Sequence, residues 1–380
     1  MKLYINGPIN IIKLEGSIKN IKKKIYIFMD IHLKENKKTS CVEVSKYNEN
    51  IDVNKYFEKL INESEYEIDF FFEIQDRFLK NPEKYKFQNR YIDNIFKMFI
   101  KNFKKKTEHG IMESIKTKNT RIHYSDLRDK LLIQETMNIF IPMVKDINNK
   151  KIDSIDKLQD INEKLKITNS YIINIFNILY SKTKKTDVIL NEKKREKIKK
   201  IHDKLRLKYK NKEISIIINK LLNNEIYEDF ISIMKKYENL LNLLNNSIKN
   251  KFNDNIIRSL ITNIQKIIHK YSKIMSRITD LYFIRRFLDK EYIKNGISYT
   301  GLSHSVMYIF VLIKYFNFKI TDHSNIKEIN EIYELSKATE KLPHYMNLSQ
   351  IKSNKIYEKF ITTTYNEKIY QCSIINEIKF

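Results

Sequence analysis

The chain has 380 residues, of which 42% are hydrophobic and 12% aromatic, and this excludes a chain that is disordered as a whole. Its 5 glycines and 4 prolines are too few for a loop-rich all-β protein and favour long helices. The formal net charge of +25 favours contact with polyanions such as nucleic acid, although lysines that only solvate the surface, in the Lys/Asn/Ile bias of AT-rich codons, explain it equally well.

The first residues and the cysteines indicate the cellular compartment that we expect for the chain. The first residues, MKLYINGPINIIKLEG, lack the apolar core of a signal peptide, and no run approaches the ~18 apolar residues of a membrane span. Cys41 and Cys372 lie at opposite ends and can pair only if the termini meet in space. We therefore expect no secretion, no integral membrane segment, no disulfide scaffold and a reducing compartment.

The N-terminal third alternates between strand and helix patterns. INIIKLEG and KKIYIFMD read as two strands joined by a turn, and IDFFFEI reads as a strand buried on both faces. Helical spacing is expected at 54–63 and 89–105, and a polar loop at 107–119. A strand then begins at Arg121, and Ser125 or Asp126 is expected to cap the helix that follows it. This order predicts an α/β fold with a mixed sheet and flanking helices.

The middle of the chain carries no strand pattern. Apolar residues recur at helical spacing in 155–180, 191–222, 225–249 and 254–290, which predicts a large all-helical insertion. Strand patterns resume in ISYTGLSH, followed by a helix and a short strand, FKIT. The sequence therefore predicts three parts: 1–135 and 291–380 as the two portions of one α/β core, and 136–290 as the helical insertion.

Polar side chains follow an apolar run in four of these segments. They are Asp30 and His32 in IYIFMDIH, Glu73 in DFFFEIQ, His304 in ISYTGLSH, and His123, Asp126 and Arg128 in RIHYSDLRD. Open α/β sheets bind ligands at the carboxyl ends of their strands, so we expect these residues to line one cleft. Ordinary surface positions after a strand, or a helix cap for Asp126, are the alternative reading of each segment alone.

These residue types suit two kinds of chemistry. Asp30, His32 and His304 can ligate a divalent metal that activates water, or a histidine beside a carboxylate can act as a general base without metal. Arg128 is suited to clamp an anion. Gly301 is expected to let the backbone turn sharply at the strand end. The other histidines, at 109, 202, 269, 323 and 344, read as surface or packing residues.

A basic segment lies within the helical region. Residues 182–212 hold 14 Lys or Arg against 4 Asp or Glu. As a helix they make a face that binds nucleic acid or another polyanion, with a solvated surface as the alternative. The residues expected to bind are Lys193, Lys194, Arg195, Lys197, Lys199 and Lys200.

Several motifs resemble known families. GPINIIKLEG, IYIFMDIH, RIHYSDLRD, ITDLYFIRRF and ISYTGLSHSVMYIFVL resemble uncharacterised proteins of giant nucleocytoplasmic large DNA viruses. This resemblance implies a place in the host cytoplasm, the viral factory or the virion. More distantly, the motif order is similar to the TraB/TIKI, erythromycin-esterase and ChaN-like superfamily, with Met29 and Asp30 departing from its early Gly and Glu.

The superfamily resemblance implies an activity and a set of site residues. By its motifs Asp30, His32, Glu73 and His304 stand at site positions, and Asp280 and Arg286 resemble a supporting polar pair. The implied function is a hydrolase of a large DNA virus, with a divalent metal as the expected cofactor and an unknown substrate. The competing hypothesis is a basic, catalytically inactive virion or nucleic-acid-associated protein.

Overall fold

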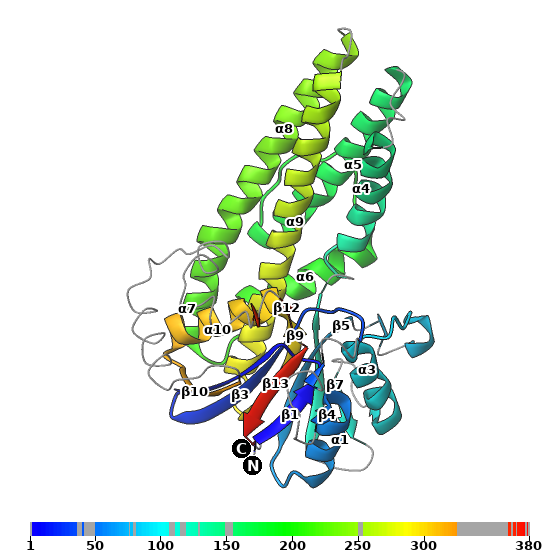
Figure 1. The fold of residues 1–380 in the computed structure, drawn as a ribbon. Helices are drawn as coiled ribbons and strands as arrows, with labels where there is room; N and C mark the ends of the chain where they lie inside the picture. The colour runs from blue at the N-terminus through cyan, green and yellow to red at the C-terminus, as the bar shows by residue number, and fades with distance from the viewer. Residues whose placement is uncertain are drawn as a thin grey trace. The chain divides into compact units, whose positions relative to one another are not determined.

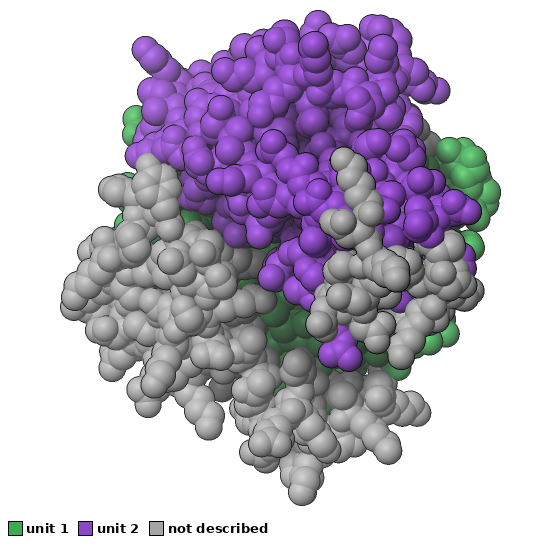
Figure 2. All heavy atoms as spheres, turned by 90° about the horizontal axis from the view of Figure 1, so that it is seen from above, with its two compact units in different colours: residues 1–126, 286–380 green, residues 127–285 purple. Residues whose placement is uncertain are grey.

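The computed structural model describes most of the chain, and the fold is reported for those residues alone. They are 2–35, 40–41, 50–75, 77–78, 81–105, 111–114, 119–127, 130–148, 155–249, 254–324, 364–365, 368–369, 371–376 and 378. The chain divides into two compact units, coloured separately in Figure 2: unit 1 is Met1–Asp126 with Arg286–Phe380, and unit 2 is Leu127–Arg285. The predicted α/β class with a helical insertion is confirmed. The three predicted domains stay a prediction.

Unit 1 is built around a mixed sheet of eight strands (Figure 1). In spatial order they are β10 (Lys319–His323), β2 (Asn10–Ile18), β3 (Ile21–Asp30), β9 (Asn295–Gly301), β5 (Ile68–Gln75), β8 (Thr120–Asp126), β7 (Ile111–Ser114) and β6 (Phe103–Lys105). The central four strands, β3, β9, β5 and β8, are parallel, and the outer ones are antiparallel. Because β9 follows the helical insertion in sequence yet lies between β3 and β5, both portions of the chain complete one sheet.

Aromatic side chains fill one face of this sheet. Phe57 of α1 (Val53–Glu63) packs edge-on against Phe28 and Phe70, with ring centroids 4.8 Å apart in each pair. Phe99 of α3 (Tyr91–Asn102) meets Phe70 in the same way. Buried aromatic pairs of this kind add about 0.5–1.5 kcal/mol each beyond their buried area. The continuous apolar run of β5 therefore forms because the sheet is covered on both faces.

The opposite face is covered by helices from the C-terminal portion. α10 (Leu302–Phe316) contacts β2, β3 and β9, and Phe287 at the end of α9 (Asp254–Asp289) packs edge-on to Phe71. The last turn of α9 is fixed by Lys23, whose buried ammonium donates to the carbonyls of Phe287, Lys290 and Ile293. A cation at a helix C-terminus satisfies carbonyls that have no partner within the helix.

The two ends of the chain meet in a second, smaller sheet. β1 (Lys2–Asn6) lies between β13 (Cys372–Asn376) and β4 (Asn50–Asp52), and Cys41 and Cys372 form a disulfide. The condition for this pair, that the termini meet, is thus fulfilled. The expectation of a reducing compartment rested on unpaired cysteines, so this disulfide removes the support for it. A two-stranded ribbon joins β11 (Thr364–Tyr365) to β12 (Lys368–Ile369).

The described residues of unit 2 form helices joined by loops and contain no strand. Its elements are α4 (Ile133–Asn148), α5 (Ile155–Tyr180), α6 (Glu192–Arg206), α7 (Lys212–Leu221), the π-helical turn η4 (Leu222–Ile226), α8 (Tyr227–Lys249) and α9 through Arg285. α5 packs against α4, α6 and α8, and the buried Tyr237 hydroxyl of α8 bonds Thr168 of α5 at 3.0 Å. Asp229 of α8 pairs with Arg277 of α9 at 2.9 Å. Among the described residues no helix is long and apolar enough to cross a membrane.

Three local expectations are corrected by the structure. The polar loop expected at 107–119 contains β7, because Ile111–Ser114 pairs with the neighbouring β8. The single helix expected at 191–222 breaks after Arg206 and restarts where the Asn211 side chain caps α7 by accepting from the Glu213 amide. Asp126 ends β8, and the helix expected directly after it, α4, begins only at Ile133.

Candidate functional site at the strand ends

Three parallel strands deliver polar side chains to one edge of the central sheet. In the register of the sheet Asp30, the last residue of β3, lies beside Gly301, the last residue of β9. Glu73 lies on β5 one residue beyond the pair that Phe72 makes with Tyr299 of β9. His304 follows in the first turn of α10. We call Asp30, His32, Glu73, Gly301 and His304 the strand-end cluster.

His32 is held in an unusual backbone conformation by Asp30. Its φ of 54° lies in the left-handed region, which residues other than glycine adopt rarely. The Asp30 carboxylate accepts from the His32 backbone amide at 3.1 Å and from ring atom Nδ1 at 2.8 Å. This local Asx-type turn compensates the backbone cost and holds the ring between Asp30 and Glu73.

Glu73 is the centre of the strand-end cluster. Its Oε2 lies 3.3 Å from His32 Nε2 and accepts from the Gly301 amide at 2.5 Å, while its Oε1 lies 3.5 Å from His304 Nε2. The side chain of Glu73 is 9% exposed, whereas those of His304 and His32 are 17% and 30% exposed. Solvent or a ligand therefore meets the two imidazoles first, with the carboxylates behind them.

The two carboxylates keep His32 charged. Burial by itself lowers the pKa of His32, but the hydrogen bonds and charges of Asp30 and Glu73 outweigh burial and raise the pKa to about 10. His32 is thus an imidazolium at neutral pH, with both ring N–H groups directed at carboxylate oxygens. It stabilises charge and orients Glu73, and cannot itself accept a proton in this state.

Gly301 is required for close approach and not for a special turn. Its backbone has φ −59° and ψ 151°, which any residue adopts, so the expected sharp glycine turn is wrong. A Cβ at this position would lie 3.0 Å from His32 Nε2 and 3.2 Å from Glu73 Oε2. The missing side chain therefore leaves room for the bonded pair of His32 and Glu73.

His123 lies deeper, near the middle of β8, in a different set of contacts. Its Nε2 lies 2.6 Å from Asp69 Oδ1, and Arg286 Nε donates to its Nδ1 at 2.9 Å. Arg121 donates to both Asp69 oxygens at 2.9 Å, and the His123 ring stacks on Phe71 with centroids 4.8 Å apart. We call Asp69, Arg121, His123 and Arg286 the buried histidine network.

The surroundings of His123 keep it neutral. Burial lowers its pKa to about 4, helped by the charges of Arg286 and Arg121 and opposed by Asp69. Because Arg286 donates to Nδ1, the proton of the neutral ring sits on Nε2 and is donated to Asp69. The paired Arg121 and His123 in turn hold the pKa of Asp69 below its ordinary value, against the effect of burial.

Asp69 and Arg121 were missed in the sequence, although a signal for them existed. Side chains two residues apart on a strand share a face, so Asp69, Phe71 and Glu73 in DFFFEIQ all point to one side of β5. The same alternation in RIHYSD places Arg121 with His123 on β8. A charged residue near the start of each of two buried strands, Asp69 and Arg121, therefore indicated that the two side chains pair across the strands.

The remaining predicted residues fall in several places. Asp126 is buried at the end of β8, paired in the sheet with Gln75 of β5. Arg128 lies outside the described residues. Asp280 is buried within unit 2, while Arg286 belongs to unit 1, where it bonds His123. We predicted that these residues share one site with the strand-end cluster. For His123, Asp126, Arg128 and Asp280 this stays a prediction.

The strand-end cluster does not fit the expected metal. Within the described ranges no group of three His, Cys, Asp or Glu side chains is arranged to hold a metal ion. The donor chemistry gives the reason, since both ring nitrogens of His32 carry protons directed at carboxylates and offer no lone pair. The residues predicted as ligands, His32, His304 and Asp30, are instead bonded or paired through Glu73 and one another.

Fold and cluster together define an α/β protein with a helical insertion and a histidine–carboxylate cluster at the ends of its parallel strands. The chain belongs to a family of unknown function, DUF5847, which it matches over residues 3–378. No solved structure matches it significantly.

Its relatives come from a giant virus, which confirms the first resemblance seen in the sequence. The chain is similar to uncharacterized protein R706 of Acanthamoeba polyphaga mimivirus, with 32% identity over 86% of this chain and 87% of the relative. It is also similar to uncharacterized protein R161 of the same virus, with 27% identity over 92% and 93%. The similarity to the TraB/TIKI, erythromycin-esterase and ChaN-like superfamily finds no support in these comparisons.

Proposed function

We propose that the chain is a hydrolase whose strand-end cluster activates water by acid–base catalysis. The observation that carries this proposal is the series of contacts from Asp30 through His32 and Glu73 to His304, from segments up to 274 positions apart (304 − 30). Ionisable groups with strongly shifted pKa values gather at functional sites more often than elsewhere. The carboxyl ends of parallel strands are also where α/β proteins bind ligands.

Each residue has a role that follows from its contacts. His304 takes a proton from the attacking water, and Glu73, 3.5 Å from its ring, orients the imidazole and stabilises the imidazolium that forms. The His32 imidazolium holds Glu73 ionised, so that Glu73 can pair with the His304 imidazolium while water adds to an ester carbonyl. His304 then returns the proton to the leaving alcohol, which balances the step. No part of this scheme passes through a metal.

A panel of p-nitrophenyl esters of increasing acyl length, followed at pH 6–9, tests the proposal. Glu73→Gln and His304→Gln should each lower kcat/KM by about 100-fold or more, the scale of general acid–base catalysis. His269→Gln replaces an exposed histidine of unit 2 and is the matched control, with expected full activity. Full activity in His304→Gln, or no hydrolysis of any ester by the unaltered protein, would contradict the proposal.

We propose binding of nucleic acid or another polyanion as a second candidate function, centred on α6. Five of the six predicted residues are exposed on this helix: Lys193, Arg195, Lys197, Lys199 and Lys200. The sixth, Lys194, is half-buried and pairs with Glu135 at 3.3 Å, so it stabilises unit 2. Under this candidate the chain works in the viral factory or virion, or elsewhere in the host cytoplasm, and its strand-end cluster need not be active.

Binding to duplex DNA over a range of salt concentrations tests the second candidate. Each phosphate neutralised contributes about −0.9 to the log–log slope of affinity against salt. Replacing the five exposed residues by Gln should flatten that slope and leave ester hydrolysis unchanged. An unchanged slope, or no retention of DNA at low salt, would mean that the lysines only solvate the surface.

A further inference from the structure

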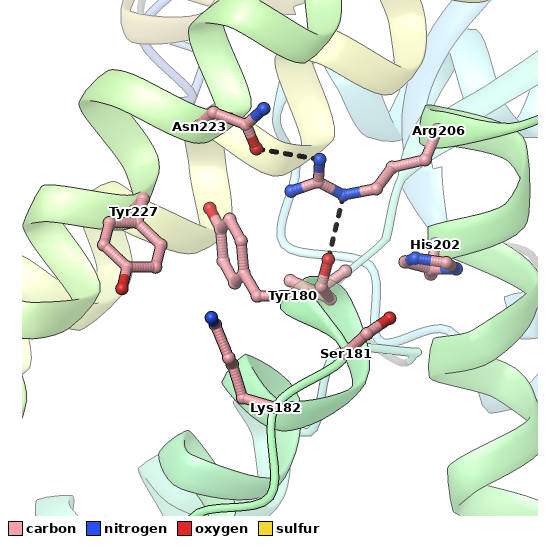
Figure 3. A pocket seen from close by; sticks show the side chains of 8 residues that line it. Tyr180, Ser181, Lys182, His202, Arg206, Asn223 and Tyr227 are labelled. Carbon is pink, nitrogen blue, oxygen red and sulfur yellow. Dashed lines mark hydrogen bonds between the residues drawn. The ribbon is translucent and has the colours of Figure 1, made fainter.

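Unit 2 contains a basic groove that neither proposed function uses in full. Two adjoining cavities of about 360 and 630 Å³ lie where the end of α5 and the segment after it face α6. They share Ser181, Lys182 and His202, and the smaller one reaches Asn223 in the π-helical turn η4 (Figure 3). π-helical turns occur often at functional sites.

One face of α6 supplies the basic side chains of this groove. Arg195, Lys199, His202 and Arg206 recur at the i, i+4, i+7 and i+11 spacing of a single helical face, and each lines one of the two cavities. Lys182 adds a further exposed ammonium. Among the described residues that line the cavities, the one carboxylate is Asp203, which lies in the larger cavity and contacts His202 Nδ1 at 3.0 Å.

Arg206 is a fixed cation without a counter-ion in the part of the chain that the structure describes. Its Nε donates to the Leu179 carbonyl at 2.9 Å, and its Nη1 donates to Asn219 and Asn223 at 3.3 and 2.8 Å. All of these acceptors are neutral. Its Nη2 is covered from solvent and has no hydrogen-bond partner among the described residues.

The burial of Arg206 costs hydration energy that none of its described partners compensates with an opposite charge. Burial lowers the pKa of Arg206, against the opposing effect of Tyr180 and Tyr209. A half-buried guanidinium held only by neutral acceptors has lost hydration without gaining a compensating charge. An anion bound beside it would supply that charge, and planar oxyanion groups such as phosphate match the geometry of its donors.

Aromatic rings adjoin this cation. The Arg206 guanidinium lies over the Tyr180 ring at 4.9 Å, and the Tyr227 ring meets Tyr180 edge-on at 5.1 Å. Figure 3 shows the Tyr180 ring between Tyr227 and Arg206, with Lys182 extending toward the two rings. Basic side chains interleaved with aromatic rings are typical of sites that hold a phosphate and stack a base.

We propose that this groove binds a nucleoside phosphate unit, with its phosphate at Arg206, Lys182 and Lys199 and its base against Tyr180 and Tyr227. The inference deepens the second candidate function, because it names a nucleotide with an unstacked base as the ligand. The unit comes either from a free nucleotide or from single-stranded nucleic acid. Duplex DNA presents its phosphates but not the faces of its bases, and so fits the groove poorly.

The test uses the full chain, with anisotropy of a fluorescent ten-nucleotide oligo(dT) as the readout. The groove variant Lys182→Gln/Lys199→Gln removes two exposed charges, and the matched control Lys235→Gln/Lys236→Gln removes two exposed charges from α8, outside the predicted binding residues. The groove variant should bind about tenfold more weakly, since a charge-assisted hydrogen bond is lost. The control should change affinity less than about threefold, as expected for a distant charge.

Arg206→Lys, which keeps the charge but loses the planar donors, should weaken binding as the groove variant does. AMP should displace the oligonucleotide at lower concentration than inorganic phosphate, because only AMP carries a base. Displacement by AMP in the micromolar to millimolar range would assign a free nucleotide, whereas competition only by unlabelled oligonucleotides would assign single-stranded nucleic acid.

The outcomes separate this inference from the function on which it rests. Equal weakening by the groove and control variants would overturn the groove and leave only diffuse binding of polyanions to the basic surface. Binding of duplex DNA without binding of oligo(dT) or AMP would do the same. Failure of the unaltered protein to bind any of these probes at low salt would overturn both.

Discussion

Two histidines on the same sheet are held in opposite charge states. His32, at the strand ends and 30% exposed, lies between the carboxylates of Asp30 and Glu73, and its pKa is raised to about 10. His123, 1% exposed in the middle of β8, lies between Asp69 and the guanidinium of Arg286, and its pKa is lowered to about 4. The imidazole is the same, so its neighbours decide its charge.

The comparison shows that solvent exposure and the charge of the partners together set the charge state of a histidine. His32 has two carboxylates as partners and retains access to water, so the charged ring is stabilised. The one carboxylate beside His123 is already neutralised by Arg121, and burial penalises a further charge. The strand-end cluster is thus suited to acid–base chemistry, whereas the buried histidine network is suited to holding β5, β8 and the end of α9 together.

Removing the carboxylate of the buried histidine network should have the largest effect on stability. Asp69→Asn leaves the Arg121 guanidinium without its bidentate partner, and we expect a loss of about 3 kcal/mol in the free energy of unfolding, measured by urea denaturation. Glu67→Gln is the matched control, because it removes the exposed carboxylate that pairs with the same Arg121. That change should cost less than about 1 kcal/mol, and equal losses would show that the network is not the stabilising feature.

The charged state of His32 should make stability fall in alkali. Because its folded pKa of about 10 lies above the unfolded value of 6.5, its contribution is fully present below pH 6.5 and is lost as pH rises through 10. His32→Asn tolerates the positive φ and should flatten the dependence between pH 7 and 10.

This measurement compares the free energy of unfolding of the unaltered protein with that of His32→Asn at each pH. Lys23, whose pKa burial lowers to about 8, titrates in the same range with the opposite sign. Its effect cancels in the difference because it is present in both proteins. A difference in unfolding free energy that stays constant from pH 7 to 10 would contradict an imidazolium at His32.

The neutral state of His123 should make stability fall in acid. Its folded pKa of about 4 lies below the unfolded value of 6.5, so its contribution is full above pH 6.5 and is lost as pH falls toward 4. His123→Gln should weaken this dependence between pH 4 and 6.5. NMR titration of the histidine ring carbons provides the direct measurement, and a His123 signal that titrates near pH 6.5 would refute the assignment.

The smallest expected effect is that of a side chain at Gly301, which lies against the bonded pair of His32 and Glu73. Gly301→Ala places a Cβ against His32 Nε2 and Glu73 Oε2, and we expect a cost of about 1 kcal/mol together with a lower pKa of His32. Gly296→Ala is the control, since the atoms nearest its Cβ would belong to Phe287 and Ile25 and not to the strand-end cluster. It should reduce stability similarly and leave the titration of His32 unchanged.

The sequence by itself determined the class of the fold and most of its central strands and long helices. Period-two and period-3.6 patterns placed the strands around Phe28, Phe71 and Ser298 and the long helices of the insertion, because side-chain periodicity follows directly from backbone geometry. The same patterns indicated that Asp30, Glu73 and His304 follow strand ends. The resemblance to giant-virus proteins was also readable from the motifs, and the comparisons confirm it.

Tertiary structure alone decided which of these residues meet and in what charge state. Glu73 bonds Gly301 across 228 positions, and Arg286 of α9 bonds His123 of β8 across 163, through strand pairing and helix packing that local patterns do not encode. Cys41 and Cys372 pair because β1 and β13 bring the termini together. The pKa of an imidazole depends on partners and burial within a few ångströms, so the imidazolium of His32 and the neutral ring of His123 are properties of the folded chain.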